Sequence, residues 1–177
     1  RDVEVMQELI RLRKQYNTNV KLGYGGFAKT ENKLSYIKKL VTLDLDNQLS
    51  NKAEIKISLQ SLDQQILDNI DRKNISLDQQ LEVFRPLSKK NQLPLYIEII
   101  MGLPGMTLDK FYHELDVLGK NNLSVMWFEW LLLPETPAYN PEYIRQFGIK
   151  TTNKNQGWAW QEDGADRNIV IQTNSYS

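Results

Sequence analysis

The chain repeats one local pattern, in which a short β-rich run is followed by a capping residue and then by an amphipathic helix. The runs with strand character are residues 19–24, 54–60, 95–101 and 124–133. Their starts are far enough apart for helical crossovers and too far apart for hairpins, which indicates parallel strands. The alternation therefore predicts an α/β fold, and periodicity alone leaves open a doubly wound sheet or part of a β/α barrel.

Three sequences carry signals for the start of a helix. Ser61-Leu62-Asp63-Gln64 and Ser76-Leu77-Asp78-Gln79 both match the capping box, in which a Ser hydroxyl and a Gln side chain bond free backbone N–H groups. Thr107 precedes a third apolar-periodic stretch. We therefore expect helices to begin at these three points.

The pattern changes after Pro134, and we expect a barrel part over residues 1–139 and a loop-rich extension over residues 140–177. Residues 142–147 are expected to form one or two helical turns, and residues 169–173 alternate like a strand. The chain starts and stops inside regular structure, so we expect it to be an excerpt of a longer protein.

Composition excludes several classes of function. Lys plus Arg and Asp plus Glu each number 22, so broad capture of nucleic acid or of an anionic membrane has no support. No apolar run approaches the roughly 18 residues of a membrane span. Cysteine is absent and His113 is the only histidine, which excludes disulfides, thiolate metal sites, a cysteine nucleophile and a catalytic triad within these residues.

In a parallel α/β fold, ligands bind at the C-terminal ends of the strands. Gln60 and Ser61 end the second run, and Arg72 follows the next short helix. An arginine that lies over the strand ends can bind a carboxylate through two hydrogen bonds. A glutamine at a strand end can form hydrogen bonds with a sugar or an amino acid. The alternative is that Gln60 caps the helix and Arg72 pairs with Asp68 or Asp71 on the surface.

The third run supplies two further candidates. Glu98 lies in an otherwise apolar strand, where it either accepts ligand hydroxyl groups or points outward and pairs with Lys56. Gly102 and Gly105 lie in the turn after this run. The two glycines either allow a ligand to approach the backbone or simply form a tight turn.

The fourth run is unusually bulky. Strand alternation puts Trp127 and Glu129 on one face, where they contact a substrate or belong to an aromatic core. The glycine-rich residues 23–26 are too short and misspaced for a dinucleotide-binding loop.

Three motifs in this order resemble radical S-adenosylmethionine (SAM) enzymes. They are Leu59-Gln60-Ser61 with Arg72, Gly102-Leu103-Pro104-Gly105-Met106-Thr107, and Leu132-Leu133-Pro134-Glu135-Thr136-Pro137. Later stretches, at residues 141–143, 147–149 and 173–177, are most similar to cobalamin-binding members and to peptide epimerases.

The resemblance implies a partial β/α (TIM-like) barrel, of which this chain supplies roughly the third to the sixth strand. It also implies that residues near the strand ends hold SAM: Gln60 with Ser61, Arg72 on the carboxylate, Glu98 on the ribose, Gly102 beside the adenosyl group, and the backbone of Leu132 and Leu133 at adenine.

The family's Cys-x-x-x-Cys-x-x-Cys loop is missing, so the ligands of its 4Fe-4S cluster would lie outside this chain. The implied parent is an enzyme that cleaves SAM to a 5′-deoxyadenosyl radical and abstracts hydrogen from a small-molecule or peptide substrate, for methylation or epimerisation. We expect this fragment alone to be inactive. Kinship further implies a reductant such as flavodoxin or ferredoxin, a cytoplasmic location, and cobalamin as a candidate cofactor.

Two other functions remain open at this point. An ordinary β/α-barrel enzyme would use Glu98 and Glu129 as acid and base. A degenerate barrel without a cluster would act only as a binding module for a peptide or a partner.

Overall fold

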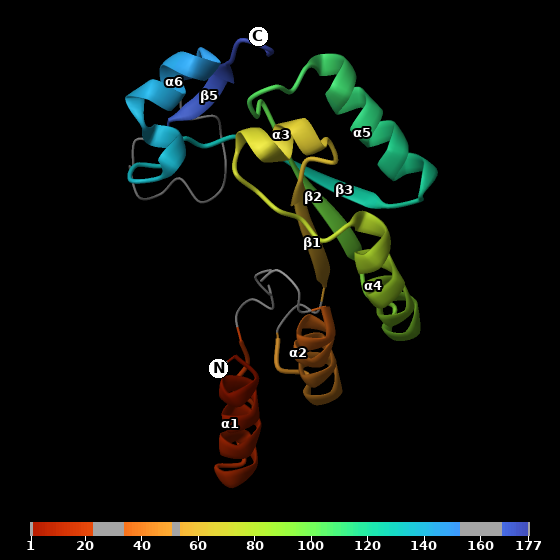
Figure 1. The fold of residues 1–177 in the computed structure, drawn as a ribbon. Coiled ribbons are helices and arrows are strands. Elements are labelled where there is room, and N and C mark those ends of the chain that lie inside the picture. Colours follow the sequence, from red (N-terminus) through yellow and green to blue (C-terminus); the bar gives the residue numbers. More distant parts are fainter. Residues whose placement is uncertain (1, 23–33, 51–53, 153–167, 177) are drawn as a thin grey trace. The chain divides into compact units, whose positions relative to one another are not determined.

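A computed structural model describes residues 2–22, 34–50, 54–152 and 168–176. Its elements, in chain order, are α1 (Asp2–Gln15), α2 (Leu34–Asn47), β1 (Ile55–Gln60), α3 (Gln64–Asn69), α4 (Leu77–Asn91), β2 (Leu95–Met101), α5 (Leu108–Lys120), β3 (Ser124–Glu129), the 3-10 helix η1 (Pro137–Tyr139), α6 (Pro141–Phe147), β4 (Lys150–Thr152) and β5 (Ile169–Gln172) (Figure 1).

The strands form two sheets. β1, β2 and β3 make a parallel sheet with β2 in the middle, and helices α3, α4 and α5 lie in the connections between these strands. β4 and β5 pair antiparallel in a second sheet. The parallel strands and helical crossovers confirm the predicted α/β fold class.

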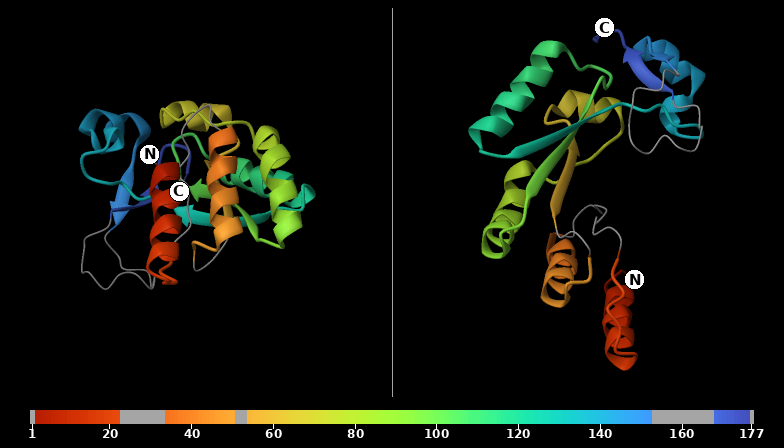
Figure 2. Two further views of the ribbon diagram at one scale, coloured as in Figure 1. Left: turned by 90° about the horizontal axis from the view of Figure 1, so that it is seen from below. Right: turned by 180° about the vertical axis from the view of Figure 1, so that it is seen from behind.

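The chain divides into two compact units. The first comprises Arg1–Leu59 and Asn74–Ile97, and the second comprises Gln60–Lys73 and Glu98–Ser177. In the first unit, α1 and α2 lie side by side (Figure 2). They share an apolar cluster whose buried residues are Val3 and Met6 on α1, Leu40 on α2 and Leu49 just after α2.

In the second unit, α5 lies alongside β3 (Figure 2). The turn between β2 and α5 is buried at Leu103 and Met106, which are 1% and 0% exposed. Leu118 on α5 and Ile66 on α3 are also fully buried, so this unit has an apolar core of its own.

Two of the three predicted helix starts are confirmed. The Ser76 hydroxyl accepts a hydrogen bond from the Gln79 N–H (3.3 Å) at the start of α4. The Thr107 hydroxyl accepts one from the Lys110 N–H (3.2 Å) at the start of α5. Both caps use only residues that are close in sequence, as the capping motif requires.

The capping box at Ser61 is wrong. The cap of α3 is Asp63, whose carboxylate accepts a hydrogen bond from the Ile66 N–H (3.1 Å), so the helix begins at Gln64. Ser61 is buried, and its hydroxyl donates to Glu114. The Ser61 hydroxyl, which the motif predicted to cap α3, therefore forms a tertiary hydrogen bond to Glu114 on α5.

Two predicted strands differ from the observed ones. In residues 19–22, the described part of the first run, β-pairing is limited to an isolated parallel bridge between Leu22 and Ser50. Residues 23–26 lie outside the described part of the chain.

The fourth run forms a strand only as far as Glu129. Beyond it, the Trp130 carbonyl accepts a hydrogen bond from the Val170 N–H (2.9 Å), and the Leu132 N–H donates to the Asn168 carbonyl (2.8 Å). The backbone after β3 thus pairs with the segment around β5, which a local pattern does not reveal.

The helix expected over residues 142–147 is confirmed as α6, and the strand expected over residues 169–173 is confirmed as β5. The domain division at residue 139 stays a prediction. Over the described ranges, none of the helices has the length and apolar character that a membrane span requires.

Candidate functional site

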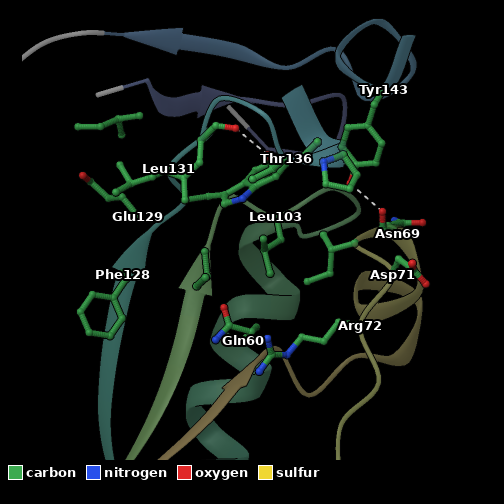
Figure 3. Close-up of a pocket in the computed structure, with 17 residues that line it drawn as sticks. Gln60, Asn69, Asp71, Arg72, Leu103, Phe128, Glu129, Leu131, Thr136 and Tyr143 are labelled. Carbon is green, nitrogen blue, oxygen red and sulfur yellow. Dashed lines mark hydrogen bonds between the residues drawn. The ribbon is translucent and has the colours of Figure 1, made fainter. Parts of the chain in front are cut away.

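The second unit contains a cavity of about 680 Å³, a size typical of small-molecule sites. Its polar lining residues are Gln60, Asn69, Asp71, Arg72, Glu129, Thr136 and Tyr143 (Figure 3). The remaining lining is largely apolar: Ile70, Ile100, Leu103, Phe128, Trp130, Leu131, Leu133, Pro137, Ala138 and Ile169.

Gln60 and Arg72 reach the cavity from the two ends of one connection. Gln60 is the last residue of β1, and Arg72 follows α3. Figure 3 shows their side chains next to each other at one side of the cavity. The alternative in which Gln60 caps α3 is wrong, because Asp63 is the cap.

The arginine is partly buried, and burial lowers the pKa of its guanidinium. A partly desolvated guanidinium beside an amide suits a carboxylate ligand, since it offers paired N–H donors in a fixed plane.

Gln60 and Asp71 have backbone angles that side-chain-bearing residues rarely adopt. Their φ values are 69° and 49°, in the left-handed region that favours glycine. Such angles persist only where the surrounding structure holds them, and they cluster at ligand sites. Both residues line the cavity.

Ser61 is not part of the cavity lining. It is 1% exposed, and its hydroxyl donates to the carboxylate of Glu114 on α5. The same carboxylate oxygen accepts from the Leu62 N–H (2.8 Å) and from the Asp63 N–H (3.3 Å). Burial raises the pKa of Glu114, and these hydrogen bonds act against that rise.

The candidates on β2 and in the turn after it are outside the cavity lining. Glu98 is partly buried within β2, and Lys56 forms an ion pair with Glu54 (2.7 Å). Gly102 has a φ of 86°, and a Cβ atom there would meet the Tyr176 ring at 3.7 Å, an ordinary contact distance. A ligand contact for Glu98 or Gly102 stays a prediction.

Of the two leucines in the third motif, Leu133 lines the cavity and Leu132 is buried outside it. The Leu133 carbonyl accepts a hydrogen bond from the Thr136 hydroxyl (2.7 Å; Figure 3). The Leu132 N–H donates to Asn168, so that donor is already used.

The structure separates the two predicted substrate residues. Glu129 is among the cavity residues, although its carboxylate points away from Gln60 and Arg72 in Figure 3. Trp127 is 47% exposed and is not part of the lining. It therefore does not belong to an aromatic core.

Asn69 and Tyr143 are cavity residues that the sequence did not single out as site residues. The Tyr143 hydroxyl donates to the Asn69 carbonyl (2.7 Å; Figure 3), and burial raises the pKa of Tyr143 to about 12. The Asn69 amide donates to the Pro104 carbonyl (2.8 Å), and the Gly105 N–H donates to the Ser175 hydroxyl (2.9 Å). The one available signal was the family-like stretch at residues 141–143.

In the described part of the chain, no group of His, Asp or Glu side chains is arranged to hold a metal ion. His113 is exposed on α5. The site thus offers a guanidinium and an amide at one side, the further polar side chains of Asn69, Asp71, Glu129, Thr136 and Tyr143, and an otherwise apolar lining. This arrangement suits an organic ligand with a carboxylate and a large apolar or aromatic part.

Comparison with known proteins yields two curated relatives, although no protein-family model matches the chain. The cobalamin-dependent radical SAM methyltransferase TokK of Streptomyces tokunonensis is 35% identical over 100 residues, which cover 55% of this chain and 14% of TokK. The 2-(S-pantetheinyl)-carbapenam-3-carboxylate methyltransferase of Streptantibioticus cattleyicolor is 30% identical over 127 residues, which cover 68% of this chain and 18% of that enzyme. The chain therefore spans less than a fifth of these relatives.

Two solved structures share the fold. Both are of the radical SAM methyltransferase TsrM from Kitasatospora setae, one with tryptophan substrate and the SAM analogue aza-SAM, the other with cobalamin and a 4Fe-4S cluster. The first has a TM-score of 0.58 at 11% identity and covers 95% of this chain and 36% of TsrM. The second has a TM-score of 0.55 at 12% identity and covers 95% of this chain and 37% of TsrM. The comparisons confirm the predicted resemblance: the chain is similar in sequence to radical SAM methyltransferases and shares the fold of TsrM over the part that it spans.

Proposed function

We propose that the cavity of the second unit binds SAM, and that the chain is the SAM-holding part of a longer radical SAM methyltransferase. The observation that carries the proposal is the meeting of Gln60 and Arg72 at one side of a largely apolar cavity. The relatedness to TokK and the fold shared with TsrM support it.

In this proposal, the Arg72 guanidinium binds the methionyl carboxylate, and the Gln60 amide bonds a neighbouring polar group of the ligand. The apolar wall around Leu133 accepts the adenine ring. Glu98 and Gly102 are proposed to contact the ribose and the adenosyl group, because β2 and its exit neighbour the β1 exit in the sheet. Ser61 and Leu132 support these contacts from behind the lining.

The iron–sulfur cluster does not fit these residues, since thiolates hold such clusters and the chain contains no cysteine. We therefore propose that its ligands lie outside these 177 residues and that this fragment alone is inactive. In the longer protein, cluster and cobalamin would supply electron transfer and methyl transfer, while this chain binds and orients SAM.

The proposed substrate is a small molecule or a peptide, and its proposed contacts are Glu129 in the cavity lining and Trp127, which lies outside that lining. Methylation is better supported than epimerisation, because the relatives are methyltransferases. We further propose a flavodoxin or ferredoxin as reductant and a cytoplasmic location. Acid–base catalysis by Glu98 and Glu129 is less well supported, because only Glu129 lines the cavity.

The proposal is tested with the full-length protein, reconstituted with iron and sulfide and supplied with SAM and a reductant. We expect release of 5′-deoxyadenosine, measured by chromatography, and a requirement for three spaced cysteines elsewhere in the gene product. A full-length sequence without such cysteines, together with no 5′-deoxyadenosine, would contradict the enzyme proposal and favour a binding module.

A further inference from the structure

Residues 61–63, which follow Gln60, form hydrogen bonds to one buried carboxylate on α5, that of Glu114. Glu114 is 2% exposed, and its Oε1 accepts hydrogen bonds from the Ser61 hydroxyl, the Leu62 N–H (2.8 Å) and the Asp63 N–H (3.3 Å). A single acceptor thus engages donors from three consecutive residues. The geometry of this turn therefore depends on the position of Glu114.

A second side chain of the same helix holds the same turn. Lys110 Nζ lies 2.9 Å from the Asp63 carboxylate, which also caps α3 through the Ile66 N–H (3.1 Å). Lys110 and Glu114 are four residues apart, so they lie on one face of α5. This face therefore fixes the connection that carries Gln60 at its start and Arg72 just beyond α3.

A glutamate at position 114 is energetically unfavourable for the folded state. Among the described residues, its second oxygen, Oε2, is buried with no hydrogen-bond partner. A buried polar atom without a partner costs free energy, and an apolar side chain would fill the same space without that cost. What the carboxylate adds is an acceptor that sets the position of three donors.

The turn begins directly after a residue whose backbone needs support. Gln60 has a φ of 69°, which is unfavourable for a residue with a side chain and persists only where neighbours impose it. The hydrogen bonds to Glu114 start at the next residue, Ser61. They are therefore placed to hold the Gln60 side chain at the cavity.

We propose that Glu114 is a positioning residue, which acts through residues 61–63 to hold Gln60 in its binding position at the cavity. It does not touch the ligand, and Lys110 supports it through Asp63. The inference rests on the proposed function in that the ligand it serves is SAM.

The test is a double-mutant cycle on the SAM dissociation constant of the full-length protein, measured by calorimetry. Glu114→Leu should weaken binding about tenfold in the wild-type background, and less than about threefold in a Gln60→Ala background. Glu114→Gln retains the Oε1 acceptor and should stay within about threefold of the wild type. Asp116→Leu, on the exposed side of α5, is the matched control and should leave the dissociation constant unchanged.

Equal losses from Glu114→Leu in both backgrounds, or no loss, would overturn the inference, because a merely structural acid has no coupling to Gln60. If Glu114→Leu does not fold, Lys110→Met is the second test, because the ion pair it removes is partly exposed and its loss should leave the core intact. A loss of about threefold that disappears with Gln60→Ala supports the inference, and an unchanged constant overturns it. Failure of the proposed function has a different result: the wild-type protein itself would not bind SAM.

Discussion

The Tyr143 hydroxyl donates a hydrogen bond to the Asn69 carbonyl at 2.7 Å, which joins α6 to the end of α3 across 74 residues of sequence. Both residues line the cavity, and the Asn69 side-chain amide donates a hydrogen bond to the Pro104 carbonyl. The C-terminal part of the second unit therefore takes part in shaping the proposed SAM site.

Tyr143→Phe should lower the free energy of unfolding by about 1–2 kcal/mol, because it leaves the Asn69 carbonyl without this donor. The measurement is thermal or denaturant unfolding, and Tyr139→Phe at an exposed position of η1 is the matched control. The phenol that titrates near a pKa of about 12 should disappear from the ultraviolet titration only in Tyr143→Phe. Equal stability of the two variants would contradict a structural role for this bond.

Gly105 is placed where a side chain does not fit. Its φ is 89°, and a Cβ atom there would lie 2.7 Å from the Asn69 amide nitrogen. Gly105→Ala should therefore destabilise the protein by roughly 1–3 kcal/mol. Gly119→Ala is the control, since a Cβ there meets nothing within 4 Å and alanine favours the helix. The two alanine variants should shift the unfolding midpoint in opposite directions, and a shift in the same direction would be the contrary result.

The buried carboxyl of Glu114 predicts a pH dependence of stability. Burial raises its pKa in the folded protein above the ordinary value of 4.5, so the folded state binds this proton more tightly than the unfolded state does. The free energy of unfolding contributed by this group should therefore fall as pH rises from about 4.5 through the raised folded-state value.

Glu114→Gln should remove that part of the pH profile. The neighbouring Asp63 acts in the opposite sense: burial alone would raise its pKa, but Lys110 and the α3 N-terminus lower it overall. Its contribution is lost as pH falls below about 3.8, outside the Glu114 window. Identical unfolding profiles of wild type and Glu114→Gln above pH 4.5 would contradict this prediction.

What the sequence predicted well depended on local rules. The caps at Ser76 and Thr107 involve partners three residues away, and the parallel strands follow from the spacing of the β-rich runs. Gln60 and Arg72 both line the cavity because Gln60 ends β1 and Arg72 follows the short helix α3, which leads the chain back to the end of that strand. The sequence pattern of a strand followed by a short helix predicts this arrangement.

What the sequence did not predict depended on contacts between distant residues. Ser61 is not the helix cap: Asp63 caps α3, and the Ser61 hydroxyl donates instead to Glu114, 53 residues away. β3 ends at Glu129, and the backbone that follows it pairs with residues near 170. Such contacts are set by tertiary packing and leave no periodic trace in the chain.

The most direct test of the proposed SAM site is the affinity of the full-length protein for SAM with and without the Arg72 guanidinium. Arg72→Ala should weaken binding by about 1.5–3 kcal/mol, or roughly 10- to 150-fold, because it would remove the proposed charge-assisted hydrogen bond to the ligand carboxylate. Arg145→Ala, an exposed arginine on α6 of the same unit, is the control and should bind like the wild type. Isothermal titration calorimetry with equal dissociation constants for wild type, Arg72→Ala and Arg145→Ala would contradict the account.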